Sequence, residues 1–402
     1  MKKEPNFYKL TFVTGLICVL SIVSVSLYIV SMPSILKNLK LTKDLVQLSL
    51  AIYVIGQTLG PLVSTIIVNF FGYYNSLLLV STWFSIASFF CLISSDPLFL
   101  CASRFIEGFS IFVALTIGYA AIRESFSIIN STRAFAITSL MASLAHIIAP
   151  VSGGIIEETV GFKFNFLALF IISVILIFFL ISFKNTAHSK LLVSKKQIPS
   201  FLGFIKKIKY VKQIISCRIF IFYTSIMIGL NICTWIFFTI SPFYYIEHSK
   251  IRSDIYGHHM AFTTIGYVIG SWLMLYLPNR YNINTLLLFG ISLCFTSGIA
   301  IITLEISHTF LTIGITICQF IYALGKAIVS PIIQAKVLSI GYEEKTLLSS
   351  LFFFISMLGS SVGSFLGIVM ESNSMMPLGI IIMVVTVLTF AFHRHLQFSR
   401  SL

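Results

Sequence analysis

Residues 46–69 read VQLSLAIYVIGQTLGPLVSTIIVN, and residues 256–279 read YGHHMAFTTIGYVIGSWLMLYLPN. A glycine, a second glycine four positions later and a following asparagine occupy the same places in both stretches, 210 positions apart. These residues are Gly56, Gly60 and Asn69 in the first stretch and Gly266, Gly270 and Asn279 in the second. A signature repeated at this distance indicates a duplicated helical bundle.

The composition places this bundle in a membrane. Hydrophobic residues make up 57% of the 402 residues and charged residues only 10%, which is too little charge to cover a soluble protein of this size. In hydrocarbon every backbone N–H and C=O must be paired within the protein, so the chain must form helices or a closed barrel. The apolar runs have the length of membrane-spanning helices, and the short alternating segments of a barrel are missing. We therefore expect an all-α membrane protein.

Twelve spans are predicted, in two pseudo-symmetric bundles of six. They lie at about 10–32, 44–68, 76–95, 98–121, 134–157, 164–183, 217–243, 257–278, 284–303, 309–333, 346–370 and 377–393. The chain then divides into a first bundle at 1–183, a basic linker at 184–216 and a second bundle at 217–402. Lysines on one side of residues 200–212 and apolar residues on the other predict an amphipathic helix within the linker.

The positive charge predicts the orientation of the spans. The net charge is +14, but nine Lys/Arg and no acid lie between Lys184 and Arg218, which is typical of a cytoplasmic segment rather than of a nucleic-acid-binding surface. With the N-terminus inside, the cytoplasmic segments hold 19 Lys/Arg and the outer segments hold six. We expect a monomer in the bacterial inner (cytoplasmic) membrane, with both termini cytoplasmic and no nucleic-acid partner.

Motifs of soluble enzymes and metal sites are missing from the sequence. There is no Walker loop, no nucleotide-binding glycine fingerprint and no zinc spacing, and the seven cysteines lie in or beside apolar segments without a C-x-x-C pair. We therefore expect no enzymatic activity, no cofactor, no metal and no direct use of ATP.

Several segments resemble a known family of membrane proteins. They are Val46-Gln47-Leu48-Ser49-Leu50, Gly56-Gln57 with Gly60, Arg104-Phe105, Arg123-Glu124, Ala149-Pro150 with Gly153-Gly154, and Ser241-Pro242-Phe243. Their order and spacing resemble the major facilitator superfamily, and within it the bicyclomycin/chloramphenicol-resistance (Bcr/CflA) branch of drug:proton antiporters. The resemblance implies export by proton exchange. Pro150 with Gly153 and Gly154, and Gly359 and Gly363 in the eleventh span, are expected to serve close helix packing or gating.

The chain departs from this family at two charged sites. The loop after the second span usually carries an acid and arginines that lock the inner gate, whereas here Asn69, Gly72 and aromatic residues occupy it. The branch usually carries an aspartate two residues before a tyrosine in the first span, whereas here Ser26 precedes Tyr28. We expect the gate to close by hydrogen bonds and aromatic packing, and any proton coupling to depend on another acid.

Three charged residues, Arg104, Glu107 and Lys326, are predicted well inside spans, where charge is costly and therefore usually functional. Glu107 follows Arg104 by three residues, on the same helix face. Such a carboxylate is able to exchange its proton when its cationic partner moves, so Glu107 is our candidate proton carrier and Arg104 its partner or a substrate anchor. A static ion pair is the alternative. Lys326 either extends to the inner surface or faces the substrate path.

Other candidates are weaker. Tyr28, Gln57, Asn231 and Gln319 could line the path, although the amides could equally bond a neighbouring helix. Tyr53, Phe109 and Tyr119 are candidates for an aromatic wall. Arg123 and Glu124 are expected in an inner-face cluster. Glu157, Glu158 and Glu305 are expected to be solvated near the outer surface.

The sequence thus predicts a secondary transporter that exports small amphipathic compounds, neutral or anionic, in exchange for protons. Loss of the usual acids keeps open an alternative, transport of an endogenous organic anion or siderophore-like metabolite. A second alternative is a sensor or scaffold that no longer transports, since the gate loop has lost its charges.

Overall fold

A computed structural model describes residues 7–126, 128–184, 211–308, 311–338, 340, 345–371 and 373–398. The described residues form helices and short connections. In chain order the α-helices are α1 (Phe7–Asn38), α2 (Lys43–Ile93), α3 (Pro97–Ser125), α4 (Ile128–Val160), α5 (Phe162–Lys184), α7 (Arg218–Pro242), α8 (Ser253–Leu273), α9 (Ile283–Ser307), α10 (Leu311–Leu338), α11 (Lys345–Val369) and α12 (Met376–Phe398). A π-helical turn (Phe243–His248) continues α7, and a 3₁₀ turn (Leu277–Asn279) precedes α9.

The predicted all-α membrane fold is confirmed. Ten helices in the described part of the chain are long and apolar enough to cross a membrane, and Met376–Ala391 is a shorter apolar helix. One of the ten, α2, contains most of both the second and the third predicted span, so each of the twelve predicted spans overlaps a helix within the described residues. Of the predicted linker, 184–216, only Lys184 and residues 211–216 are among the described residues.

The 51-residue helix α2 is two helices joined at Gly72. A straight helix of that length would measure about 77 Å, far more than the roughly 30 Å of a hydrocarbon core. Gly72 has φ 76° and ψ 166°, a backbone conformation that residues with a Cβ rarely adopt. The Ser76 hydroxyl donates to the Ile67 carbonyl oxygen across the turn, at 3.1 Å. Tyr73 and Tyr74 are buried there, whereas Phe70 is exposed.

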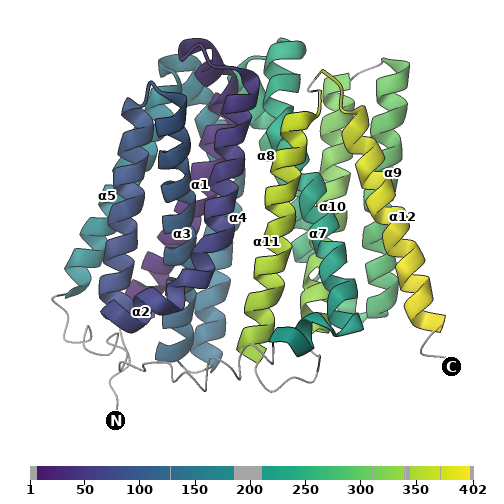
Figure 1. Ribbon diagram of the computed structural model, residues 1–402. Helices are drawn as coiled ribbons and strands as arrows, with labels where there is room; N and C mark the ends of the chain where they lie inside the picture. The colour runs from purple at the N-terminus through teal and green to yellow at the C-terminus, as the bar shows by residue number, and fades with distance from the viewer. Residues whose placement is uncertain are drawn as a thin grey trace. The chain divides into compact units, whose positions relative to one another are not determined.

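The chain forms two compact units. One comprises Met1–Pro199 with Arg252–Gly257, and the other Ser200–Ile251 with His258–Leu402. Within the first unit α1 packs on α3, α4 and α5, and α2 packs on α3 and α5; within the second unit α7 packs on α10, α11 and α12, and α9 packs on α10 and α12. Figure 1 shows the helices of the first unit running from purple through blue to teal, and α7 to α12 from teal through green to yellow. Spans one and five pair as spans seven and eleven do, which is the pattern expected of a duplication.

The glycines that revealed the duplication make equivalent helix contacts in the two units. A Cβ on Gly56 would collide with the carbonyl oxygen of Phe105 on α3, and a Cβ on Gly60 with that of Phe109. In the second unit Gly266 faces the carbonyl oxygen of Phe320 on α10 in the same way, and Gly270 faces that of Leu324. These glycines let the two backbones of each helix pair touch.

The glycines of the fifth and eleventh spans also pack in matching ways. Gly153 on α4 lies against Leu27 of α1. Gly359 and Gly363 on α11 lie against the backbone of Ile228 and Ile232 of α7. These glycines therefore fix the distance between the first and fifth helix of each unit.

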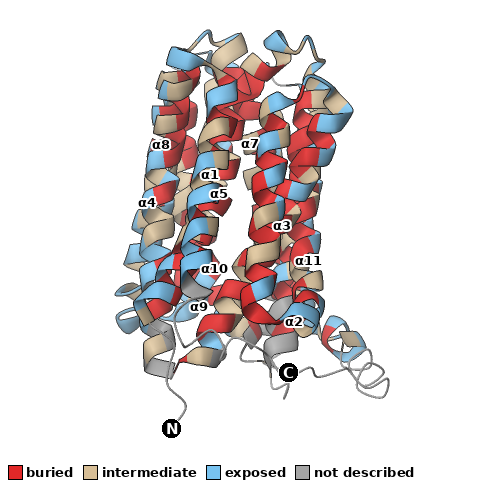
Figure 2. Ribbon diagram, turned by 90° about the vertical axis from the view of Figure 1, so that its left-hand side faces the viewer, coloured by how far each residue is buried: buried red, intermediate tan, exposed pale blue. Residues whose placement is uncertain are grey.

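Large apolar side chains remain exposed along the helices of both units. Examples are Phe178 at 69% exposure, Leu140 at 63% and Trp272 at 56%. Figure 2 shows exposed and buried residues on the same helices, so that one face of a helix is packed and another is bare. Bare faces of this apolar character suit contact with lipid.

Candidate functional site

The first unit buries an ion pair between α2 and α3. Arg104 Nη1 donates to Glu107 Oε2 one helical turn away, and both side chains have no exposed surface. Ser88, on the second half of α2, donates from its hydroxyl to Glu107 Oε1 at 2.9 Å. The Cys91 thiol lies 3.9 Å from Glu107 Oε2. The predicted pairing along one face of the helix is present, and Glu107 is held by two helices.

Two tyrosines enclose the guanidinium of Arg104. Its central carbon lies 4.1 Å from the ring centroid of Tyr28 on α1 and 4.0 Å from that of Tyr53 on α2. The Tyr28 hydroxyl hydrogen-bonds with Ser49 on α2 and lies 3.2 Å from the Val46 carbonyl oxygen. A planar cation between aromatic faces is stabilised by both ring quadrupoles. We call Arg104, Glu107, Tyr28, Tyr53 and Ser88 the Arg104 cluster.

The guanidinium in this cluster has hydrogen-bonding capacity to spare. Arg104 Nε and Nη2 are buried and have no hydrogen-bond partner among the residues that the structure describes. Buried donors without acceptors are uncommon in folded proteins, because each one loses its hydrogen bonds to water and gains no bond within the protein. Arg104 therefore has donors available for a further acceptor, provided that Tyr28 or Tyr53 moves aside to admit it.

The second unit holds Lys326 deeper than the sequence suggested. The helix α10 continues to Leu338, so Lys326 lies twelve residues, or about 18 Å, from the end of the helix. Its ammonium donates to Thr234 Oγ1 on α7 at 2.6 Å. Among the described residues no carboxylate lies within ion-pair distance of Lys326. It is a cation between helices without an acidic partner, rather than one extended to the surface.

The predicted path-lining amides occupy different environments. Asn231 on α7 donates to the Ser356 carbonyl oxygen of α11 at 2.9 Å, which makes it a contact between helices. Gln57 is buried on α2, one turn after Tyr53. Gln319 is buried on α10, and its Nε2 has no hydrogen-bond partner within the described ranges.

The predicted gating residues do not gather into one cluster. Asn69 lies half-buried next to the Gly72 turn, and Arg123 is exposed in the last turn of α3. The side chain of Glu124 lies outside the described residues. Pro150 and Gly154 are buried on α4.

The expectation that the three outer acids are solvated is wrong for Glu157. Its side chain is 7% exposed and hydrogen-bonded to α1 and α5, whereas Glu158 is exposed and pairs with Arg252 at 3.3 Å. Glu305 is half-buried and accepts from the Tyr244 hydroxyl at 3.0 Å and the Met375 N–H at 2.9 Å. It therefore ties the start of α12 to the π-helical turn. Sequence position near a helix end did not reveal these partners.

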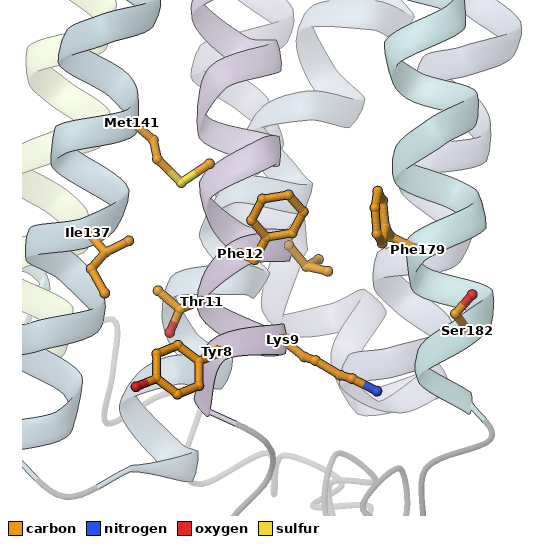
Figure 3. A pocket seen from close by; sticks show the side chains of 9 residues that line it. Tyr8, Lys9, Thr11, Phe12, Ile137, Met141, Phe179 and Ser182 are labelled. Atoms are coloured by element: carbon orange, nitrogen blue, oxygen red, sulfur yellow. The ribbon is translucent and has the colours of Figure 1, made fainter.

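An apolar pocket of about 400 Å³ lies apart from the Arg104 cluster, between α1, α4 and α5. It is lined by Tyr8, Lys9, Thr11, Phe12, Val13, Ile137, Met141, Phe179 and Ser182. Figure 3 shows Phe12 and Phe179 on adjoining walls, with Lys9 and Ser182 toward one end. Three of the lining rings, those of Tyr8, Phe12 and Phe179, are exposed, so the pocket is a depression of the protein surface.

Known membrane proteins resemble this chain in sequence. The family model described as Major Facilitator Superfamily matches residues 14–318. An uncharacterized MFS-type transporter of Bacillus subtilis, YdgK, is 23% identical over 94% of this chain and 93% of its own length. The chloramphenicol resistance protein CraA of Acinetobacter baumannii is 22% identical over 68% of this chain and 65% of its own. That match agrees with the resemblance to the Bcr/CflA branch.

Solved structures share the fold at low sequence identity. A peptide transporter POT in complex with sulfate superposes with a TM-score of 0.77, at 12% identity, over 97% of this chain and 94% of its own. A D-xylose–proton symporter superposes with a TM-score of 0.73, at 12% identity, over 95% of this chain and 97% of its own. At these identities the likeness extends to the fold and not to the substrate.

Proposed function

The chain belongs to the major facilitator superfamily and is a multi-pass membrane transporter rather than an enzyme, and on that premise we propose that it exports small amphipathic compounds in exchange for protons. The substrates would be drug-like and neutral or anionic, and the membrane would be the bacterial inner membrane, with both termini in the cytoplasm. The named activity of CraA and the resemblance to the Bcr/CflA branch support export of this kind.

Glu107 carries this proposal, because it is a fully buried carboxylate that two helices hold against a buried cation. While Glu107 is ionised, Arg104 neutralises it. When α1 or α2 moves and Tyr28 or Tyr53 leaves the guanidinium, the pair opens and the carboxylate is able to take a proton. An exchanger needs such a group, because proton binding and substrate binding must alternate at one site that faces each side in turn.

Replacement of Glu107 by glutamine is expected to uncouple transport from the pH gradient. In proteoliposomes with an imposed gradient the wild-type protein should move a chloramphenicol-like substrate several-fold faster than without one. Glu107→Gln keeps the side-chain shape and removes the titration, so its transport rate should be the same with and without the gradient. Glu158→Gln, which alters an exposed acid, should behave as the wild type.

Retention of the full gradient response in Glu107→Gln would remove Glu107 from the coupling role. Absence of substrate flux in the purified wild-type protein would instead favour the sensor or scaffold alternative.

A second candidate function, transport of an endogenous organic anion, is supported by Lys326. An ammonium held between α7 and α10, with no carboxylate partner among the described residues, is costly inside a membrane protein. A substrate carboxylate would offset that cost by forming charge-assisted hydrogen bonds with the two ammonium hydrogens that Thr234 does not take.

The charge of Lys326 is expected to distinguish anionic from neutral substrates. Lys326→Met keeps most of the side-chain length and removes the charge, and should slow uptake of an amphipathic carboxylate on the order of tenfold, the worth of a charge-assisted hydrogen bond. Lys326→Arg should retain most of that activity. Transport of a neutral compound should change little in either variant, as competition assays with the two substrate types would show. Equal loss of both substrates in Lys326→Met would assign Lys326 to packing.

A further inference from the structure

Glu157 is a second buried acid in the first unit, and the ion pair of the Arg104 cluster does not involve it. It lies near the end of α4, and its side chain is 7% exposed. The Ser31 hydroxyl on α1 donates to Glu157 Oε2 at 2.5 Å. Asn165 on α5 donates from Nδ2 to Ser31 Oγ at 2.7 Å and lies 3.5 Å from Glu157 Oε2. Three helices therefore meet at this carboxyl group.

No cation neutralises this group within the described residues. The charged side chains on the surrounding elements at this end are exposed: Lys37 on α1, Glu158 on α4, Lys163 on α5, and Arg252, which pairs with Glu158. Asp254, half-buried, pairs with Arg252 as well. An ionised carboxylate at Glu157 would thus be buried with neutral hydrogen-bond donors alone, which is an expensive arrangement.

The hydrogen-bond network around Glu157 also has more acceptors than donors. The Asn165 amide nitrogen serves Ser31, Glu157 and the Gly153 carbonyl oxygen, the last at 3.2 Å. The Asn165 Oδ1 atom is buried and accepts no hydrogen bond from the described part of the chain. A protonated carboxyl group brings one O–H donor into a cluster that has acceptors to spare. Both the charge and the hydrogen-bond inventory therefore favour the neutral form of Glu157.

From this geometry we propose that Glu157 is a second proton-binding residue of the first unit, which holds its proton while α1, α4 and α5 are packed as they are here. Loss of that proton leaves an uncompensated buried charge and loosens the contact of the three helices. Ser31 follows Tyr28 by three residues on α1, so the same helix touches Glu157 and the guanidinium of Arg104. Protonation of Glu157 thereby favours the position of α1 in which Tyr28 covers Arg104.

Infrared difference spectra of the purified full-length protein in lipid nanodiscs test the proposal without any substrate. Between mildly acidic and alkaline buffers the wild-type protein should lose a C=O stretching band of a protonated buried carboxyl group. This band should be missing at every pH in Glu157→Gln and present in Glu158→Gln. In Glu107→Gln it should also be present, so that failure of proton coupling at Glu107 leaves this result unaffected.

Thermal unfolding across the same buffers provides a second readout. The melting temperature of the wild-type protein should fall by several degrees as the pH rises, because the cluster then holds an unpaired charge. Glu157→Gln keeps the hydrogen bonds with Ser31 and should lose most of this dependence, whereas Glu158→Gln should keep it. Identical infrared bands and identical pH dependence in the wild-type protein and Glu157→Gln would overturn the proposal.

Discussion

Replacement of Arg104 by alanine is expected to abolish coupled transport and to cost about 3–5 kcal/mol of stability, the usual penalty for removing one partner of a buried ion pair. The penalty arises on Glu107, whose carboxylate would lose its cation and keep uncharged partners such as the Ser88 hydroxyl and the Cys91 thiol. The two tyrosine rings would also face a cavity where the guanidinium was. The measurement is the melting temperature of the purified protein, together with transport in proteoliposomes.

A double variant separates the charge from the cavity. Arg104→Ala with Glu107→Gln leaves no unpaired charge, so it should recover much of the stability that Arg104→Ala alone loses. The cavity between Tyr28 and Tyr53 remains in both variants, and recovery should therefore be incomplete. Transport coupled to the pH gradient should stay absent in the double variant. Equal melting temperatures for the single and the double variant would mean that the buried charge on Glu107 is not the source of the loss.

Substitution of Gly56 by valine is expected to leave little folded protein. Even a methyl group at this position would collide with the carbonyl oxygen of Phe105, and a backbone atom moves only if the whole of α3 moves. Overpacking a tight contact typically costs about 1–3 kcal/mol, and a contact between two backbones should lie at or above the upper end. The fraction of monodisperse protein in size-exclusion chromatography measures the effect.

Two further substitutions test whether the effect at Gly56 comes from the contact between two helix backbones. Gly266→Val should be as damaging, because Gly266 meets the carbonyl oxygen of Phe320 in the same geometry. Gly15→Ala should be tolerated, because its added methyl group meets only the flexible end of Met141. Replacing glycine within a helix normally raises helix propensity, by about 1 kcal/mol for alanine and less for valine, so a loss of stability at Gly56 reports the contact. Well-folded Gly56→Val would contradict the close approach of α2 and α3.

The fold was predictable because its signals are local and repeated. Span length is set by the thickness of the membrane, and each helix pair needs small residues where its backbones touch, so Gly56 and Gly266 were informative without any structure. The π-helical turn at Phe243–His248 was not foreseen, since the seventh span was predicted to end at residue 243. The sequence also did not show that the second and third predicted spans join directly at Gly72, without a separate loop between them.

The site was predictable only where its residues share one helix. Arg104 and Glu107 are three residues apart, so helix geometry alone places them on the same face. Ser88 was missed, because the contact depends on the packing of the second half of α2 against α3. Burial of Glu157 was missed for the same reason: Ser31 and Asn165, which cover it, come from other helices. Neither position carries a spacing signal that would link it to its partner.

The shared register of the glycine contacts has a chemical consequence. Phe105 and Phe320 are equivalent, as are Phe109 and Leu324, and each pair is separated by 215 positions (320−105 and 324−109). The same offset carries Arg104 onto Gln319 and Glu107 onto Tyr322, whose hydroxyl donates to the Leu230 carbonyl oxygen at 2.6 Å. One ancestral scaffold therefore holds a salt bridge in its first copy and an amide beside a phenol in its second. The two copies therefore share a shape but differ in chemistry, because only the first of them carries a carboxyl group at this position.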